Sequence, residues 1–365
     1  MDLKILNIKY FTDQLLHWYP LHQRDLPWRS TDDPYIIWLS EIILQQTRVT
    51  QGLPYFYLFL EKFPDVFSLA KATEEEVMRC WQGLGYYSRA RNLHRCAKEI
   101  VADHGGQFPD NYHELLKLKG VGSYTAAAIA SFAFKEKVAV LDGNVFRVLS
   151  RYFGISEDIS GTSGKKTFQK LANEVIPDDL SDVYNQAVME FGALQCVPRS
   201  PVCKECPLAL RCFAYQHQAV EQLPYKTKRV KINERYLWYF HIICDGHVVI
   251  NRREDKDIWR GLVDFPSAEK AGLKHLEEVE PNELPVMTSL KHLGPVVDFP
   301  LQKPFKHVLT HQRIFASFAK ITVPKEMKKQ LGRWAEDNLY ELAASEKLEL
   351  LGKPKLIVRY LNHIK

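Results

Sequence analysis

The sequence contains no long hydrophobic run and no segment that resembles an export signal. A helix that spans a membrane needs about 20 mostly apolar residues in a row, and no such stretch occurs. The N-terminal residues, MDLKILNIKYFTDQLLHWYP, lack the apolar centre of a signal peptide and the Arg- and Ser-rich composition of a transit peptide. We therefore expect a soluble, cytoplasmic protein that does not bind membranes.

The sequence also has little net charge, and it has neither an internal repeat nor a low-complexity tract. Its 49 Lys and Arg residues exceed its 44 Asp and Glu residues by a formal charge of +5. If nucleic acid is the partner, it must be bound by local basic stripes and backbone N–H groups. With 365 residues, of which 46% are hydrophobic, the chain is long enough for two or three domains.

Cysteine is scarce, but four of the seven cysteines lie close together with the spacing C-x6-C-x2-C-x5-C. They are Cys196, Cys203, Cys206 and Cys212. In a chain without a secretion signal, such clustering favours a metal site over disulfides. Four thiolates suit either a [4Fe–4S] cluster or a tetrahedral zinc ion. Zinc sites usually contain two tight pairs, and here only Cys203 and Cys206 form one. The scattered Cys80, Cys96 and Cys244 are predicted to be buried small hydrophobic residues.

The residue pattern divides the chain into a helical part, a basic linker and a mixed part. Apolar residues recur at helical spacing over residues 8–219, so residues 1–220 are predicted to be all-α. Residues 221–234 are basic and aperiodic, as in a linker. Residues 235–365 are predicted to be an α+β domain. Its expected elements are a hairpin turning at Asp245–Gly246, strands over 292–300 and 315–323, and helices over 269–279 and 332–345.

The segment LKLKGVGSYTAAAIASFAF predicts two helices joined by a glycine turn. One helix ends near Leu118, Gly120, Val121 and Gly122 form the turn, and the next helix begins at Ser123. Glycines let the backbone approach a phosphate, which the free N–H groups of the new helix can bind. Taken alone, the pattern fits an ordinary helical corner better.

Asp142 follows an apolar run, KVAVL, and precedes a predicted helix that begins GNVFRVL. The residue type and position indicate an N-cap. A carboxylate at a helix N-terminus is also favoured in its charged form by the helix dipole. Asp142 is therefore expected to remain ionised.

Glu41 lies in a predicted helix, Tyr35–Gln46, that starts after Asp33–Pro34. A glutamate in a helix usually faces solvent, but the neighbours of Glu41 at helical spacing are apolar: Ile37, Trp38 and Leu44. Removal from water should raise its pKa. Cleavage of a glycosidic bond needs a protonated acid and an ionised carboxylate, and Glu41 and Asp142 meet those needs.

Together, these segments resemble the helix-hairpin-helix DNA glycosylases, and WLSEIILQQT resembles the signature of the MutY-type adenine DNA glycosylases. The resemblance implies that Glu41 protonates adenine N7 and activates water. It implies that Asp142 stabilises the positive charge on the deoxyribose, with Tyr124 and Asn144 holding the site. Endonuclease III has a nucleophilic lysine where this chain has Tyr124, so no lysine-driven strand cleavage is expected. Lys119 replaces the proline that the family hairpin often contains.

The same resemblance assigns the cofactor and the DNA contacts. The four cysteines would bind a [4Fe–4S] cluster, in a module formed by residues 1–27 and 132–220 beside a six-helix module at about 28–131. The substrate would be duplex DNA with adenine opposite 8-oxoguanine or guanine, and the adenine must be flipped out of the duplex. The matching base contacts are Trp28, Arg29, Gln45, Gln46, Thr47, Leu84, Tyr86 and Gln186. The matching phosphate contacts are Gly120, Val121, Gly122, Arg89 and Arg91.

Segments DIWRGLVDFPSAE and KHVLTHQRI resemble the MutT-like, Nudix-fold domain with which MutY proteins recognise 8-oxoguanine. The residues that match its recognition loop are His307, Thr310 and His311. The Glu-rich box that binds magnesium in Nudix hydrolases is absent, so no hydrolysis is expected there. The resemblance implies a monomeric, nucleoid-associated bacterial repair enzyme.

Two other functions fit parts of the sequence. An endonuclease III-type glycosylase and lyase for pyrimidine lesions would share the hairpin and the cysteines, but Tyr124 and the extra C-terminal domain argue against it. A DNA-binding protein without catalytic activity would also share both features. Such a protein has no use for an acid removed from water, so Glu41 and Asp142 argue for an enzyme.

Overall fold

The computed structural model describes residues 3–227, 232–253, 257–269, 284–298, 304–309 and 311–364. Contacts divide the chain into two compact units. Unit 1 comprises Met1–Val49, Asp65–Ala70 and Arg95–Arg229. Unit 2 comprises Thr50–Pro64, Lys71–His94 and Val230–Lys365. The domain bounds predicted from the sequence stay a prediction.

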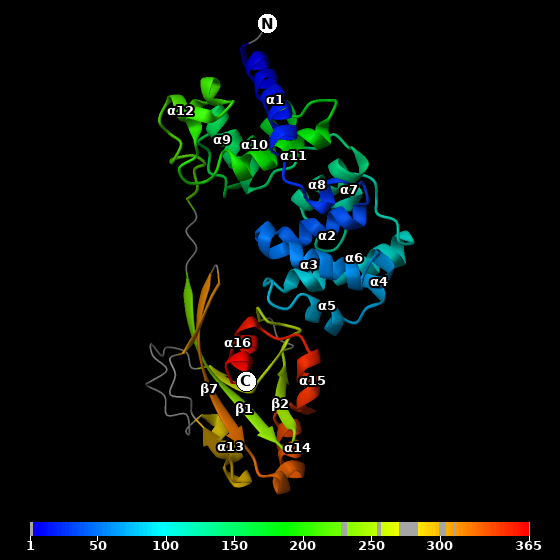
Figure 1. The fold of residues 1–365 in the computed structure, drawn as a ribbon, viewed down its shortest axis with the longest axis vertical. Coiled ribbons are helices and arrows are strands. Elements are labelled where there is room, and N and C mark those ends of the chain that lie inside the picture. Colours follow the sequence, from blue (N-terminus) through cyan, green and yellow to red (C-terminus); the bar gives the residue numbers. More distant parts are fainter. Residues whose placement is uncertain are drawn as a thin grey trace. The chain divides into compact units, whose positions relative to one another are not determined.

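Unit 1 is helical in its described residues (Figure 1). Its elements, with α6 continuing from unit 2, are α1 (Leu3–His22), η1 (Pro27–Arg29), α2 (Pro34–Leu44), α4 (Val66–Lys71), α6 (Ser88–His104), α7 (Tyr112–Leu115), α8 (Ser123–Phe134), α9 (Gly143–Phe153), α10 (Thr162–Val175), α11 (Ser181–Leu194), η2 (Cys203–Glu205), η3 (Ala209–Arg211) and α12 (Phe213–Gln216). Among these helices, α11 contacts both α1 and α9, and α2 contacts α8. The second pairing brings residues 41 and 124 into one site.

Local sequence sets the ends of the helices that carry the site. The Asp33 carboxylate accepts a hydrogen bond from the backbone N–H of Tyr35 at the start of α2, which satisfies one of the free donors of the first turn. The helix ends at Leu44, two residues before the predicted end. Gln45 leaves the helical conformation, and Gln46 has a φ of 56°. Its exposed side chain is thereby placed beyond the helix.

The glycine turn joins a single helical turn, α7, to α8. Gly120 has a φ of 78°, a left-handed conformation that glycine adopts without steric cost. The N–H of Val121 donates to the carbonyl of Leu118, and Gly122 is the N-cap of α8. The predicted start of the second helix at Ser123 is confirmed. Val121 is buried, so in this turn the two glycines rather than the valine line open space.

Unit 2 contains a mixed sheet with helices on both faces. Its helices are α3 (Val49–Lys62), α5 (Glu74–Cys80), α13 (Pro285–Leu290), η6 (Lys291–Leu293), η7 (Lys325–Met327), α14 (Lys328–Asp337), α15 (Ser345–Leu350) and α16 (Lys355–Ile364). Its strands are β1 (Asn233–Cys244), β2 (His247–Arg252), β3 (Val263–Asp264), β4 (Ser267–Glu269), β5 (Val296–Asp298), β6 (Phe305–Val308), β7 (Gln312–Thr322) and β8 (Glu341–Ala344). The main strand order is β3-β2-β1-β7-β5, and β1 and β7 are parallel.

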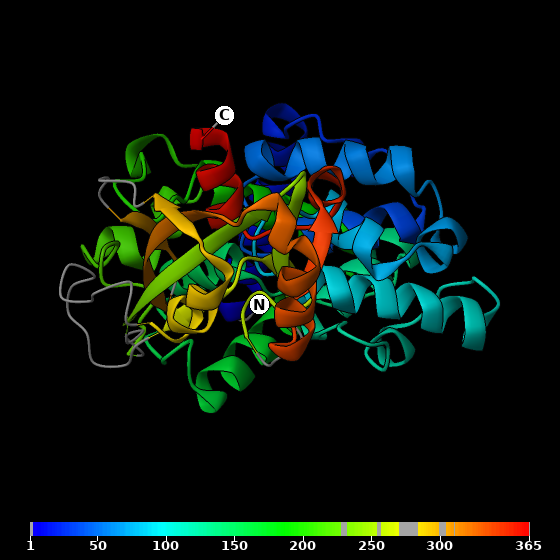
Figure 2. The ribbon, with the colours of Figure 1, turned by 90° about the horizontal axis from the view of Figure 1, so that it is seen from below.

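Alternating residues of β1 face opposite sides of this sheet, as the strand period requires. Phe240 and Ile242 pack into the core that α13 and α14 complete. His241 faces the other side, where its ring meets Tyr360 of α16. Figures 1 and 2 show α16 on one face of the sheet and α13 and α14 on the other. Asp245 and Gly246 form the hairpin turn with φ values of 44° and 71°, as predicted.

Three other sequence expectations change. The predicted helix over 332–345 is wrong after Asp337: Leu339 has a φ of 62°, and Glu341–Ala344 pairs with β2 as β8. Strand pairing overrides the helical preference of its alanines. The predicted helix over 269–279 lies almost entirely outside the described residues. Linker residues 221–227 are attached to unit 1, because Arg151 donates to the carbonyl of Leu223 and Ile159 donates to that of Tyr225.

Membrane insertion finds no support in this fold. None of the helices described is both long enough and apolar enough to cross a bilayer.

Candidate active site

Glu41 lies on the buried face of α2, with 8% of its surface exposed. Burial raises the pKa of its carboxyl to about 7, although the hydrogen bond from Tyr124 lowers it. The negative charge of Asp142 adds to the rise and the positive charge of Arg29 opposes it. A group with this pKa holds its proton about half the time at neutral pH, as a general acid requires.

Tyr124 stands on α8, opposite Glu41. Its hydroxyl donates a hydrogen bond of 2.6 Å to Glu41 Oε2. Burial, together with both nearby carboxylates, raises the pKa of this phenol well above 10, so the hydroxyl stays a donor. It therefore fixes the orientation of the Glu41 carboxyl and leaves Oε1 for another partner.

Asp142 is the N-cap of α9, as its position predicted. Oδ1 accepts the N–H of Val145 at 2.7 Å, and Oδ2 accepts the amide of Asn144 at 2.8 Å. Burial raises the pKa of Asp142, although these donors and the Arg147 guanidinium lower it. The helix N-terminus thus favours the anion as expected, but removal from water outweighs it.

The two carboxyls differ in how well the anion is stabilised. Asp142 accepts N–H bonds from two residues, whereas Glu41 accepts one O–H bond from Tyr124 among the described side chains. Two buried carboxyls in one site titrate as a pair, and the second ionisation is disfavoured. The environment therefore leaves the proton on Glu41 and the charge on Asp142, a division that acid-assisted cleavage uses.

Both carboxyls open onto one cleft of ≈ 520 Å³ in unit 1. The cleft brings together seven of the predicted site residues: Glu41, Gln45, Gln46, Gly120, Gly122, Tyr124 and Asp142. Gln45 Nε2 donates to the Thr125 hydroxyl, and the Thr47 hydroxyl donates to the carbonyl of Gln45. The cleft thus joins the two acids to the glycine turn, while Trp28, Arg29, Thr47 and Gln186 lie outside its lining.

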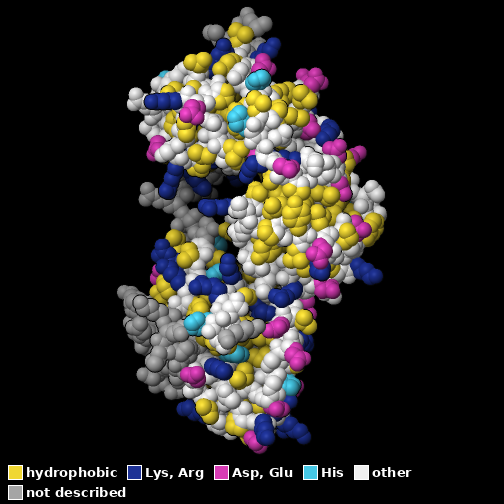
Figure 3. Space-filling view, in the orientation of Figure 1, with side chains coloured by type: hydrophobic (Ala, Val, Ile, Leu, Met, Phe, Trp, Pro, Cys, Tyr) yellow, Lys and Arg dark blue, Asp and Glu magenta, His cyan; other side chains and the backbone are white. Residues whose placement is uncertain are grey.

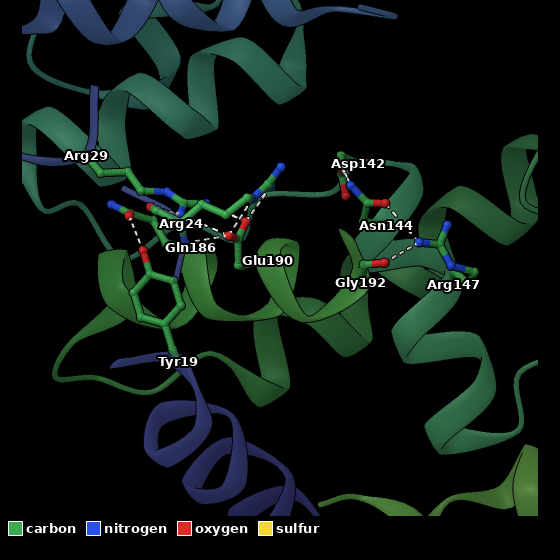
Figure 4. Close-up of polar contacts among 9 residues, drawn as sticks. All are labelled: Tyr19, Arg24, Arg29, Asp142, Asn144, Arg147, Gln186, Glu190 and Gly192. Carbon is green, nitrogen blue, oxygen red and sulfur yellow. Dashed lines mark hydrogen bonds and ion pairs between the residues drawn. The ribbon is translucent and has the colours of Figure 1, made fainter. Parts of the chain in front are cut away.

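Arg29 and Gln186 belong to a second polar group, the Glu190 cluster, which we define as Tyr19, Arg24, Arg29, Gln186 and Glu190 (Figure 4). Glu190 accepts two hydrogen bonds from the Arg29 guanidinium and two from that of Arg24. Gln186, one turn away on α11, accepts the Tyr19 hydroxyl at 2.7 Å. The sequence analysis missed Tyr19, Arg24 and Glu190. An acid between Met189 and Phe191 was the same signal that singled out Glu41.

A hydrogen-bonded chain runs from Asp142 to the cysteine loop (Figure 4). The Asn144 carbonyl oxygen accepts from Arg147 Nη2 at 2.9 Å. Arg147 also donates to the backbone carbonyls of Gly192 and Cys196, each at 2.7 Å. At Gly192 a Cβ would lie 2.6 Å from the Asn144 Cβ, so only glycine allows α11 this close to the start of α9.

The four clustered cysteines surround one small cavity in unit 1, together with Arg151. Arg151 Nη1 lies 3.5 Å from Cys196 Sγ. Burial raises the pKa of Cys206 to about 12, although the backbone N–H of Leu208 lowers it. Over the described ranges, no three His, Cys, Asp or Glu side chains stand close enough to hold a single metal ion.

Unit 2 contains a cavity of ≈ 420 Å³ between the 83–91 segment and the C-terminal sheet. Five predicted site residues line it: Leu84, Tyr86, Arg91, His307 and His311. The His307 ring lies near Trp259, 6.1 Å between centroids, and burial lowers its pKa. Thr310 lies outside the described residues.

Two arginines of this segment make contacts within the protein. Arg89 is buried, donates to the carbonyl of Gly85 and stands over the Trp81 ring. Arg91 donates to the carbonyl of Arg260. The space-filling view shows acidic and basic side chains interspersed over the helices rather than gathered in one field (Figure 3), in agreement with the small net charge.

Two family models match the chain. The model for HhH-GPD superfamily base excision DNA repair proteins matches residues 39–177, and that for the NUDIX domain matches residues 238–363. Among solved structures, a thermostable thymine-DNA glycosylase is 31% identical with a TM-score of 0.55, covering 59% of this chain and all of that one. An endonuclease III–DNA complex, 23% identical with a TM-score of 0.52 over 60% and 99% of the two chains, shares the fold.

Curated relatives carry one name. An adenine DNA glycosylase of Buchnera aphidicola is 35% identical over 76% of this chain and 80% of its own. Those of Arabidopsis thaliana and Homo sapiens are 31% and 40% identical, over 96% and 60% of this chain and 64% and 42% of theirs. The predicted fold class, a helical helix-hairpin-helix region followed by a Nudix-like domain, is thereby confirmed. The chain belongs to the adenine DNA glycosylase family.

Proposed function

We propose that this protein removes adenine from duplex DNA in which adenine is paired with 8-oxoguanine or guanine. The observation that carries the proposal is the pair of buried carboxyls, Glu41 and Asp142, opening onto one cleft beside Tyr124. A base must leave the stack before its glycosidic bond can be reached, and the glycine turn on the rim of the same cleft offers free N–H groups to the phosphate.

Glu41 is the general acid of this mechanism. As the bond between C1′ and N9 breaks, its electron pair moves into the adenine ring, and the proton of Glu41 passes to N7. The Tyr124 hydrogen bond to Oε2 leaves the proton on the other oxygen. The resulting Glu41 carboxylate then accepts a proton from the water that adds to C1′, which restores the acid.

Asp142 stabilises the sugar as positive charge develops on C1′ and the ring oxygen. The backbone N–H of Val145 and the amide of Asn144 hold its carboxylate in place, so no reorganisation is needed when the charge appears. Tyr124 offers no amine for a Schiff base. We therefore propose a glycosylase without lysine-driven strand cleavage that acts as a monomer.

The unit 2 cavity supports recognition of the base opposite adenine. 8-Oxoguanine differs from guanine by an N7–H donor and a C8 carbonyl. The cavity places His307 and His311 near the exposed ring of Tyr86 and Leu84, which combines polar groups with surfaces that stack on or wedge between bases. We infer that unit 2 recognises the lesion.

The four cysteines fit a [4Fe–4S] cluster, in which each iron takes one thiolate. The donor set is four thiols around one cavity, and Arg151 lies beside Cys196. When bound, the cluster would cross-link the 196–212 loop. Arg147, which donates to the Cys196 carbonyl, would then start from a fixed loop when it orients Asn144.

A single-turnover assay tests the proposal. Duplexes carry adenine opposite 8-oxoguanine, guanine or thymine, and products are resolved with and without alkali. We expect adenine release from the first two duplexes and strand cleavage only after alkali. Equal release opposite thymine would remove the role of unit 2, and no adenine release from any duplex would overturn the function.

A further inference from the structure

The Glu190 cluster contains more positive charge than the site chemistry described so far uses. Burial raises the pKa of Glu190, but hydrogen bonds from Arg24 and Arg29 outweigh it and lower the pKa to about 2. Glu190 is therefore an anion at neutral pH. With Arg24 and Arg29 both charged, the cluster carries a net charge of +1.

Arg24 connects the other two charges. Its backbone N–H and guanidinium all donate to Glu190, at 2.7–2.9 Å, and its carbonyl accepts Arg29 Nη1 at 2.9 Å. The Arg29 guanidinium is thus held on one side by Glu190 and on the other by Arg24, as Figure 4 shows. The Arg24 side chain keeps 39% of its surface exposed, whereas Glu190 keeps 1%.

We propose that Arg24 and Glu190 are positioning residues for the acid of the reaction: they fix Arg29 and set the net charge that Glu41 experiences. This inference rests on the proposed function. Of the charged groups that face Glu41, Asp142 precedes α9 and Arg29 belongs to η1; Tyr124 of α8 faces it as a neutral donor. Arg24 and Glu190 act on Glu41 through Arg29.

The charge balance makes opposite predictions for two substitutions. In Arg24→Gln the cluster loses a positive charge, so Glu190 neutralises Arg29 and the protonated form of Glu41 persists to higher pH. In Glu190→Gln the cluster gains a net positive charge, so Glu41 loses its proton at lower pH. Arg24→Lys keeps the charge and gives up the two-pronged bond. A charge in contact shifts a pKa by about 1–3 units, so through Arg29 we expect about half a unit.

The experiment measures the single-turnover rate of adenine release against pH for the full-length protein on the 8-oxoguanine duplex. We expect the high-pH limb to move up in Arg24→Gln, to move down in Glu190→Gln and to stay in place in Arg24→Lys. Lys117→Gln is the matched control: it removes one exposed positive charge and one ion pair of the same unit, and its limb should not move.

Each outcome decides the inference. Loss of packing alone lowers the plateau rate without moving the limb, so unmoved limbs, or limbs that move in the same direction, overturn the inference. If Glu190→Gln does not fold, the comparison of Arg24→Gln with Arg24→Lys decides alone, because Arg24 is partly exposed. If the wild-type protein releases no adenine, the proposed function fails instead.

Discussion

The Tyr124 hydroxyl donates a 2.6 Å hydrogen bond to Glu41 Oε2, although 83 positions separate the two residues in the chain. The contact joins the second and the eighth helix at the point where the proposed acid must hold its proton. It also opposes that role, because a donor to a carboxylate favours the ionised form. The pKa of about 7 is the balance between this bond and burial.

Removing the hydroxyl should shift that balance. In Tyr124→Phe the donor is lost while burial remains, so the pKa of Glu41 rises. Adenine release needs protonated Glu41 and declines as pH rises through its pKa. The decline should therefore begin at higher pH in the variant than in the wild-type protein. A single-turnover pH series measures this, and a decline at lower pH would contradict the assignment of Tyr124 as donor.

Neutral replacements of the two acids should stop the chemistry and spare binding. Glu41→Gln removes the proton that leaves with adenine, and Asp142→Asn removes the charge beside the sugar. Each should lower the single-turnover rate by about 10²–10⁴-fold, the range of general acid catalysis. Filter binding to the 8-oxoguanine duplex should remain close to that of the wild-type protein. Wild-type excision by either variant would remove its role.

Asn144 is expected to act through Asp142. In Asn144→Ala, Asp142 Oδ2 loses its amide donor and Arg147 loses one acceptor. The Asp142 carboxylate becomes less stable and less well oriented, so excision should slow by about 10-fold or more, at a net energy of about 1–2 kcal/mol for such a bond. Asn362→Ala, on the exposed side of α16, is the control and should excise at the wild-type rate.

The Glu190 cluster should make stability depend on pH in acid. The pKa of Glu190 is lowered to about 2 in the folded protein, below its unfolded value of about 4.3. Its stabilisation is thus complete above about pH 5 and is lost as pH falls towards 2. The difference corresponds to about 3 kcal/mol. Urea unfolding at several pH values checks this, and Glu190→Gln should flatten the dependence. An equally steep profile in that variant would assign the effect to other groups.

The cysteine loop should lose its metal when one thiol is removed. In Cys206→Ala we expect less than the full iron and sulfide content and a lower midpoint of thermal unfolding, because the loop loses a cross-link. Cys80→Ala, outside the loop, should keep the full content. Zinc in place of iron in the purified protein would reject the cluster.

The acids and the hairpin were predictable from sequence because their signals are local. Glu41 was recognisable from the apolar residues one turn away, and Asp142 from its place at a helix start. Glu190 was not identified as a partner of Arg24, because that pairing spans 166 positions and no spacing rule reaches so far. The strand Glu341–Ala344 was missed for a related reason: its partner, β2, overrides the preference of its own residues.

Gly192 gives the hydrogen of a single α-carbon a mechanical function. A methyl group there would act as a wedge between two helices, displacing the amide that steadies the carboxylate without touching DNA, metal or either acid. The tolerance of this enzyme to mutation is therefore not graded by distance from the scissile bond. One of its most sensitive positions carries no side chain at all.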